Sequence, residues 1–189
     1  MIGHMKGEKA LSHADLVLPA WRIRAISFQS VLLFAAVLAL PAAAHLSGLP
    51  VREVLPMHWP ILLAGLCYGW QSGLLLGLIA PGTSYLLSGM PFPHMLPSMT
   101  IELAMYGFVA GFLSQNMHWN KLKATAGAIL VGRATFIAIV FSTHAVKPPL
   151  VEYMKIALVP GIPAALCQCL LLPIAASWWV QREYARSGV

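Results

Sequence analysis

Charged side chains are scarce in this chain of 189 residues, in which 6 acidic and 12 basic residues make up only 10% of the sequence. Hydrophobic residues make up 59%, and the mean hydropathy of +0.75 is far above that of soluble globular proteins. Such a composition excludes a water-soluble globule, because the chain would have too little polar surface to show water. The net charge of +6 does not indicate nucleic-acid binding, since the basic residues are scattered singly between apolar runs.

Cysteine is also rare, and all three cysteines, Cys67, Cys167 and Cys169, lie within apolar segments. Successive residues of a helix turn by roughly 100°, so the two thiols of a Cys-x-Cys pair point about 200° apart. That pair is therefore unsuited to a shared metal ion, and we interpret the three cysteines as small buried hydrophobic residues. They imply no disulfide framework.

Several catalytic motifs are missing from the sequence. It contains no Gly-x-Ser-x-Gly elbow, no aspartate pair of an intramembrane protease, no His-Glu-x-x-His motif and no Walker loop. We therefore expect a protein that is not an enzyme and that holds no cofactor. His58, His94 and His144 fall near predicted helix ends, but without the spacing of metal ligands, so we expect no metal site.

A long stretch from Leu55 to Gly111 is almost free of charge. Its glycines recur every four residues at Gly65, Gly69, Gly73 and Gly77. Residues four apart share one face of a helix, and small residues there let membrane helices approach closely. Two histidines, His58 and His94, and a single carboxylate, that of Glu102, lie where the hydrophobic runs end or have just begun. We interpret the stretch as three membrane helices around a pocket.

Hydrophobic runs of membrane-spanning length predict an all-α integral membrane protein with six transmembrane helices and both termini cytoplasmic. A cytoplasmic segment at residues 1–24 precedes the six-helix membrane domain at 25–184, and a tail follows at 185–189. The six helices are expected at residues 25–47, 60–68, 71–87, 95–116, 122–144 and 153–184, the last broken at Pro160–Pro163 and Pro173. A cleaved signal peptide ending at Ala42–Ala44 is less favoured, because the first run is about twice the length of a signal core.

Basic residues support this orientation, since they gather on the cytoplasmic side of membrane proteins. Eight fall on the inner side: Lys6, Lys9, Arg22, Arg24, Lys121, Lys123, Arg182 and Arg186. Three fall on the outer side: Arg52, Lys147 and Lys155. Merging the second and third helices into one span would move Lys121 and Lys123 outward and make the sides about equal, so six spans are favoured over five.

Two ionisable residues, Glu102 and Arg133, lie within predicted spans. A charge near the middle of a bilayer costs a few kcal/mol even on lenient scales, so such residues face a partner, a cavity or water. On antiparallel neighbouring helices the two would lie at similar depths, and we predict that they meet or share a polar network. They could form an ion pair that only locks the helices, or they could line a solute pocket open to the outside.

An ordered set of short motifs extends across the chain. It comprises Leu55–Gly65, the glycines above, Pro81, Ser88–Pro91, Met95–Pro97, Glu102–Gly107, Gly111, Gly132–Arg133, Pro160–Ile162 and Gln168. In this order, over roughly residues 25–182, the motifs resemble the substrate-binding S component of energy-coupling factor (ECF) transporters. The resemblance is closest to the broad group that includes folate, pantothenate and cobalamin-related members.

This resemblance implies the capture subunit of an ECF-type ABC importer in the prokaryotic cytoplasmic (inner) membrane, binding a vitamin or related micronutrient at the outer face. Such a subunit works with a transmembrane coupling subunit and two cytoplasmic ATPases, which use the ATP. A strip of Ala35, Ala39 and Ala43 resembles the helix surface that contacts the coupling subunit. The ligand would be surrounded by His58, Trp59, Met90, Phe92, His94, Glu102, Tyr106, Arg133 and Gln168.

Two other classes are compatible with the residues. One is a stand-alone ion-driven carrier or channel for small solutes, which Glu102 and Arg133 would also allow, and the other is a purely structural membrane subunit. The sequence does not identify the substrate either. An Arg133 that faces the pocket would suit an anionic solute, whereas neutralisation of Arg133 by Glu102 would suit a polar neutral solute.

Overall fold

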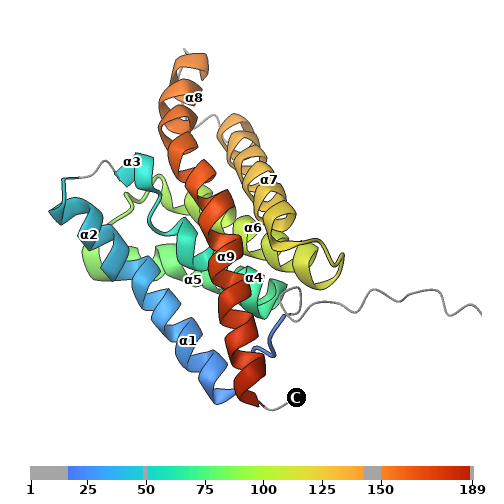
Figure 1. Ribbon diagram of the computed structural model, residues 1–189. Coiled ribbons are helices and arrows are strands. Elements are labelled where there is room, and N and C mark those ends of the chain that lie inside the picture. Colours follow the sequence, from blue (N-terminus) through green and yellow to red (C-terminus); the bar gives the residue numbers. More distant parts are fainter. Residues whose placement is uncertain (1–16, 49–50, 143–149, 188–189) are drawn as a thin grey trace, which may run out of the picture.

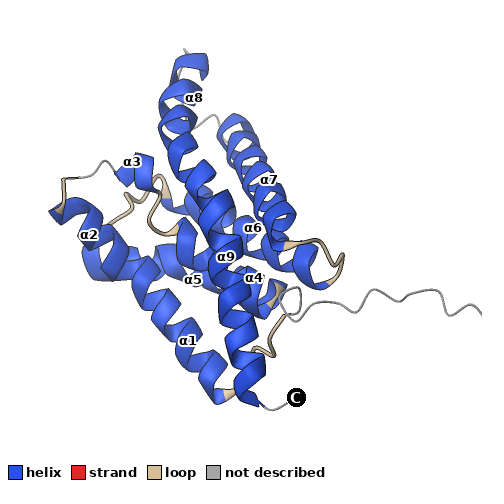
Figure 2. Cartoon of the chain, viewed as in Figure 1, coloured by secondary structure: helices blue, strands red, loops and turns tan. Residues whose placement is uncertain are grey.

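Helices joined by short loops make up the described part of the chain, residues 17–48, 51–142 and 150–187, which contains no strand (Figure 2). The coordinates are a computed structural model. The prediction of an all-helical chain is confirmed. Some residues used in the predictions, Lys6, Lys9, His144 and Lys147, lie outside the described residues.

The first predicted helix is a rod of three consecutive segments: α1 (Ile23–Phe34), the π-helical η2 (Ala35–Ala39) and α2 (Leu40–Leu46) (Figure 1). Pro41 has no N–H group, so it cannot donate to the carbonyl of Val37 four residues earlier. The Ser84 hydroxyl of α5 (Trp70–Ser88) donates to that carbonyl instead, at 3.2 Å. The π-helical segment therefore ties the rod to the rest of the bundle.

A short α3 (Val51–Val54) leads into α4 (His58–Tyr68), which is separated from α5 by Gly69 alone. Gly69 has a φ of 85°, which a residue with a side chain rarely adopts, and this allows the chain to turn sharply there. The turn is a reversal, because Gly65 before it and Gly73 after it both lie against the backbone of Gly107. The predicted separation of the second and third helices is thus confirmed.

Close packing of α4 and α5 against α6 (Leu96–Gln115) follows from the periodic glycines. A Cβ atom at Gly73 would collide with the backbone of Gly107, and one at Gly77 would collide with the backbone of Leu103 and Ala104. Such contacts between helix backbones are possible only where side chains are absent. The prediction that these glycines permit very close contact is confirmed, but they do not share one face of a single helix, because the chain reverses at Gly69.

The remaining helices are α7 (Lys121–Ser142), α8 (Leu150–Leu158), the 3₁₀ turn η3 (Val159–Gly161) and α9 (Ile162–Ser187). The expected break at Pro160 is present as η3, but the expected break at Pro173 is wrong, since α9 continues through it. The fifth predicted helix begins one residue earlier than expected, so Lys121 and Lys123 both lie in the first turn of α7.

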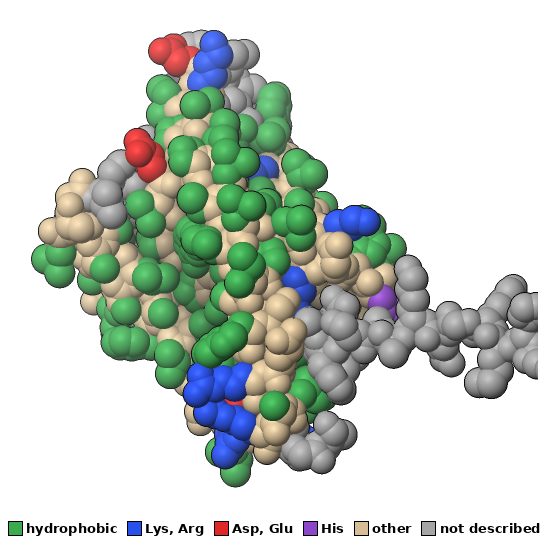
Figure 3. All heavy atoms as spheres, in the orientation of Figure 1, with side chains coloured by type: hydrophobic (Ala, Val, Ile, Leu, Met, Phe, Trp, Pro, Cys, Tyr) green, Lys and Arg blue, Asp and Glu red, His purple; other side chains and the backbone are tan. Residues whose placement is uncertain are grey.

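Within the described part of the chain, four helical stretches have the length and composition to cross a membrane: Ile23–Ala44, Leu96–Gln115, Lys121–Ser142 and Lys155–Arg186. With 11 residues, α4 is only about 16 Å long, too short to cross a hydrocarbon core of roughly 30 Å alone. With 19 residues, α5 is long enough, but its polar Gln71 and Thr83 lower its hydropathy and it is not among the four. Many hydrophobic side chains face outward (Figure 3), as they do in proteins surrounded by lipid.

The bundle has two distinct ends. One carries α3 and the α5–α6 loop, and we call it the α3 end (Figure 1). At the opposite end the segment before α1 meets the ends of α4 and α9: Leu18 N–H donates to the Cys67 carbonyl at 2.7 Å, and the Tyr184 hydroxyl to the Val17 carbonyl at 3.5 Å. Arginine side chains gather at this second end, over the start of α1 and the last turns of α9 (Figure 3).

Candidate functional site

Three helices bring ionisable and aromatic side chains together inside the bundle, toward the α3 end. His58 comes from α4, Glu102 and Tyr106 from α6, and Arg133 from α7, and we call these four residues the polar cluster. Arg133 Nη1 donates a hydrogen bond to Glu102 Oε1 at 3.0 Å, and His58 Nε2 lies 3.9 Å from the same oxygen. Only 4% of Glu102 is exposed. The prediction that Glu102 and Arg133 meet is confirmed.

Two glycines make room for the large side chains of the polar cluster. Gly132 lies against the Tyr106 ring, where a Cβ atom would come within 2.6 Å of ring carbons. Gly161 in η3 lies against the Arg133 guanidinium, where a Cβ atom would be 2.7 Å from Nη2. The His58 and Tyr106 rings meet edge to face, with centroids 4.9 Å apart. The positions of the four side chains therefore depend on glycines from α7 and η3 as well as on α4 and α6.

Several buried polar atoms around the cluster have no hydrogen-bond partner among the described residues. They are both ring nitrogens of His58, Arg133 Nη2 and, farther along α9, Gln168 Nε2. Leaving a buried polar group unsatisfied costs about 1–3 kcal/mol, so such groups normally bind water or a ligand. Gln168 follows Gly161 by seven residues, which is about two helical turns, and so lies on the same face of the chain deeper in the bundle. The cluster thus offers hydrogen-bonding capacity that the described residues do not use.

The charges of Glu102 and Arg133 balance each other. A charge buried without a partner is strongly unfavourable, and removal of one member of a buried pair typically costs about 3–5 kcal/mol. The 3.0 Å contact uses Nη1 alone and leaves the second arm of the guanidinium fork, Nη2, directed toward Gly161. The pair is therefore compatible both with a structural role and with a ligand on that second arm.

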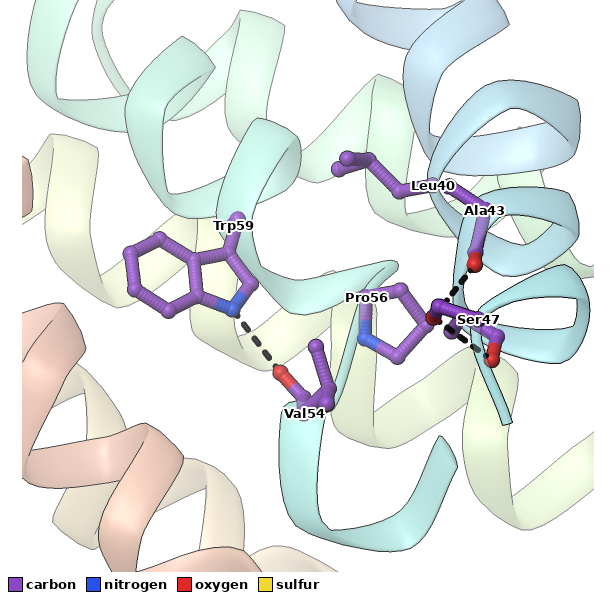
Figure 4. A pocket seen from close by; sticks show the side chains of 7 residues that line it. Leu40, Ala43, Ser47, Val54, Pro56 and Trp59 are labelled. Atoms are coloured by element: carbon purple, nitrogen blue, oxygen red, sulfur yellow. Dashed lines mark hydrogen bonds between the residues drawn. The ribbon is translucent and has the colours of Figure 1, made fainter. Parts of the chain in front are cut away.

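Trp59, another predicted ligand neighbour, forms a hydrogen bond next to the polar cluster. Its Nε1 donates to the Val54 carbonyl at 2.9 Å and so fastens α3 to α4. The same ring borders an apolar pocket of about 380 Å³ between α2, α3 and α4 (Figure 4). The residues that line this pocket are Leu40, Ala43, Ala44, Ser47, Val54, Pro56 and Trp59. No member of the polar cluster is among them, so pocket and cluster are separate features.

The predicted residues of the α5–α6 loop lie outside the buried cluster. Met90 is 40% exposed and Phe92 54%, and His94 is also exposed. The rings of Phe92 and His94 stack nearly parallel, with centroids 6.0 Å apart. In this conformation the loop leaves the three side chains at the α3 end of the molecule.

Small residues of the first rod face outward. Ala39 and Ala43 are exposed and Ala35 is half-buried, whereas the neighbouring Ala36 is fully buried against the bundle. A helix of another protein could therefore approach this side of the rod closely.

Some contact residues were absent from the predicted site. Gly161 adjoins the Arg133 side chain, Leu55 adjoins Gly161, and Gly132 adjoins Tyr106. The sequence held a signal for two of them, since Gly132 precedes Arg133 and Gly161 follows a proline at a predicted break. Lys121 was also missed: it is 3% exposed, and its Nζ donates to the Leu66 carbonyl at 3.1 Å near the end of α4. Nothing in the sequence marked this lysine as buried.

Apolar helices enclose a buried ion pair and hydrogen-bond donors that have no partner in the described part of the chain, and this arrangement is that of a membrane protein with a polar site in its interior. A family model for the substrate-specific component of ECF transporters matches residues 29–180, which include the whole polar cluster, and the chain belongs to this family. It is therefore a multi-pass membrane protein of a family of substrate-binding transporter subunits, not of enzymes. No curated protein and no solved structure matches the chain.

Proposed function

We propose that this chain is the substrate-capture subunit of an ECF-type importer in a prokaryotic cytoplasmic membrane. It binds a vitamin or related micronutrient at the outer face and delivers it together with a transmembrane coupling subunit and two ATPases. The observation that carries the proposal is the polar cluster, in which buried groups around Glu102 and Arg133 are left without hydrogen-bond partners among the described residues. A purely structural subunit would have no use for such groups.

The proposed topology has six crossings, with the α3 end outside. The crossings are the α1–α2 rod, α4, α5, α6, α7 and α8–α9, with α3 and the turn after it completing the path of the short α4. Support comes from the exposed arginines at the opposite end, Arg22, Arg24, Arg182 and Arg186, because basic residues favour the cytoplasmic side. This topology places the polar cluster where a solute can reach it from outside.

In the proposed complex the ligand occupies the space beside Arg133 Nη2 and His58. Arg133 and His58 supply hydrogen bonds, Tyr106 supplies an aromatic wall, and Gln168 reaches the ligand from the deeper side. Met90, Phe92 and His94 lie at the entrance and approach the ligand when the α5–α6 loop closes over it. The strip of Ala35, Ala39 and Ala43, in which Ala39 and Ala43 are exposed, receives the coupling subunit.

Uptake by cells tests this function. Cells that produce the chain together with a coupling subunit and both ATPases should accumulate a labelled vitamin, and cells with a hydrolysis-deficient ATPase should not. The competing function, a stand-alone ion-driven carrier, is suggested by the buried charge pair. Gradient-driven uptake by liposomes that contain only this chain would support the carrier and contradict the proposed assembly.

A further inference from the structure

The polar cluster carries opposite charges that compensate each other, together with hydrogen-bonding groups that have no partner among the residues the structure describes. We propose that the site selects a net-neutral solute that presents a hydrogen-bond acceptor beside a donor, such as an amide or the edge of a lactam ring. Glu102 is the residue that sets this selectivity. The inference rests on the proposed function and names the substrate class of the same site.

Glu102 limits the attraction of the site for anions. Its Oε1 lies 3.0 Å from Arg133 Nη1, so the guanidinium charge is already compensated before a solute arrives. An anionic group on Nη2 would lie close to the Glu102 carboxylate, which repels it. It would also lose its hydration in a buried site without an uncompensated positive charge to replace the water.

A neutral amide complements Arg133 Nη2 and the ring nitrogens of His58. Arg133 Nη2 is a buried donor, and Gly161 accommodates it because it has no side chain, since a Cβ atom there would come within 2.7 Å of Nη2. His58 has two unused ring nitrogens, and an imidazole in its neutral form offers one donor and one acceptor. Arg133 Nη1 and His58 Nε2 flank the same oxygen, at 3.0 and 3.9 Å, so one small group can reach both residues.

The proposed hydrogen bonds distinguish an amide from a carboxylate. A carbonyl oxygen accepts from Arg133 Nη2, and the adjacent N–H of the same amide donates to a His58 nitrogen. A carboxylate has the same planar shape, but it offers acceptors only and brings a charge. Sites that hydrogen-bond a particular group reject analogues that leave buried partners unpaired. The geometry therefore favours the amide over the acid of otherwise identical molecules.

Matched pairs of probes test the inference in the purified protein. Suitable pairs are nicotinamide and nicotinate, biotinamide and biotin, and lipoamide and lipoate. Affinity is measured by isothermal titration and by thermal shift. We expect the wild type to bind the neutral member of at least one pair about tenfold more tightly than its acid, which corresponds to about 1.4 kcal/mol.

Three variants assign the selectivity to Glu102. Glu102→Gln leaves the charge of Arg133 uncompensated and should reverse the preference toward the acid. The double variant Glu102→Gln/Arg133→Gln restores a neutral site and should again prefer the neutral member, although more weakly. Glu183→Gln is the matched control, because Glu183 pairs with Arg186 at 3.5 Å at the opposite end of the bundle, and its preference should equal that of the wild type.

The outcomes separate this inference from the function on which it rests. Tighter binding of acids by the wild type, or an unchanged preference in Glu102→Gln, would contradict the inference and leave the capture function standing. Binding of no probe would contradict both. Gel filtration and circular dichroism establish that each variant is folded, and the double variant, whose site holds no unpaired charge, covers the case in which Glu102→Gln alone does not fold.

Discussion

The two terminal nitrogens of the Arg133 guanidinium have different surroundings. Nη1 holds Glu102 at 3.0 Å, and Nη2 lies unpaired beside Gly161. Sequence reasoning predicted the meeting of Glu102 and Arg133, because buried charges need partners and the two residues fall at similar depths. It could not predict which arm stays unused, since that depends on where η3 places Gly161. The site residues that came from the resemblance alone, such as Met90 and Phe92, stay predictions.

Arg133→Lys separates pairing with Glu102 from contact with the ligand. A lysine ammonium can still pair with Glu102 but has no second planar arm, so it loses the contact proposed for the ligand. We expect a melting temperature close to that of the wild type and an affinity for the transported solute about tenfold weaker or worse. Titration calorimetry measures the affinity, with Arg182→Lys at the opposite end of the bundle as the matched control. Unchanged affinity in Arg133→Lys would show that Arg133 only locks the helices.

At the scale of the helices, glycines decide how α4, α5 and α6 fit together. Their four-residue period and the break after Tyr68 could be read from the sequence, and both are present in the structure. The sequence could not predict that Gly65 and Gly73 both pack on Gly107, because the reversal at Gly69 depends on a single backbone conformation. The burial of Lys121 was unpredictable for a similar reason, since its partner carbonyl belongs to α4, 55 residues away.

Gly73→Ala tests the contact between α5 and α6. The added methyl group would meet the backbone of Gly107, which cannot rotate away as a side chain could, so we expect a loss of about 1–3 kcal/mol in stability. Gly82→Ala in the same helix is the matched control, because a Cβ atom there meets nothing within 4 Å and alanine is the better helix former. Thermal unfolding in detergent compares the two variants. Equal melting temperatures would contradict the close packing.

For the whole molecule, the orientation in the membrane rests on the distribution of charge. The sequence predicted six spans from hydrophobic runs and the count of basic residues, whereas four of the observed helices suffice by length and composition. The difference arises from α4, which has only 11 residues, and from α5, in which glycines and polar residues lower the hydropathy. Average hydropathy cannot reveal a short helix that is sheltered by its neighbours.

Single-cysteine labelling tests the six crossings. In a variant with alanine in place of Cys67, Cys167 and Cys169, Ser88→Cys lies at the α3 end of the bundle and Asn116→Cys at the end of α6 opposite to it. An impermeant maleimide added to intact cells or spheroplasts should label Ser88→Cys alone. Permeabilised membranes should give labelling at both positions. Outside labelling of Asn116→Cys would contradict the orientation.

The central claim is that the polar cluster holds the transported solute, and a thermal-shift screen of the detergent-purified wild type and Arg133→Ala tests it most directly. The panel contains vitamins, their precursors and cobalamin fragments. A ligand that binds only the folded state adds about 2.7 kcal/mol at one hundred times its dissociation constant, which a melting curve resolves. We predict that one class of compound raises the melting temperature of the wild type and leaves that of folded Arg133→Ala unchanged. Equal shifts in both proteins, or no shift across the panel, would contradict the claim.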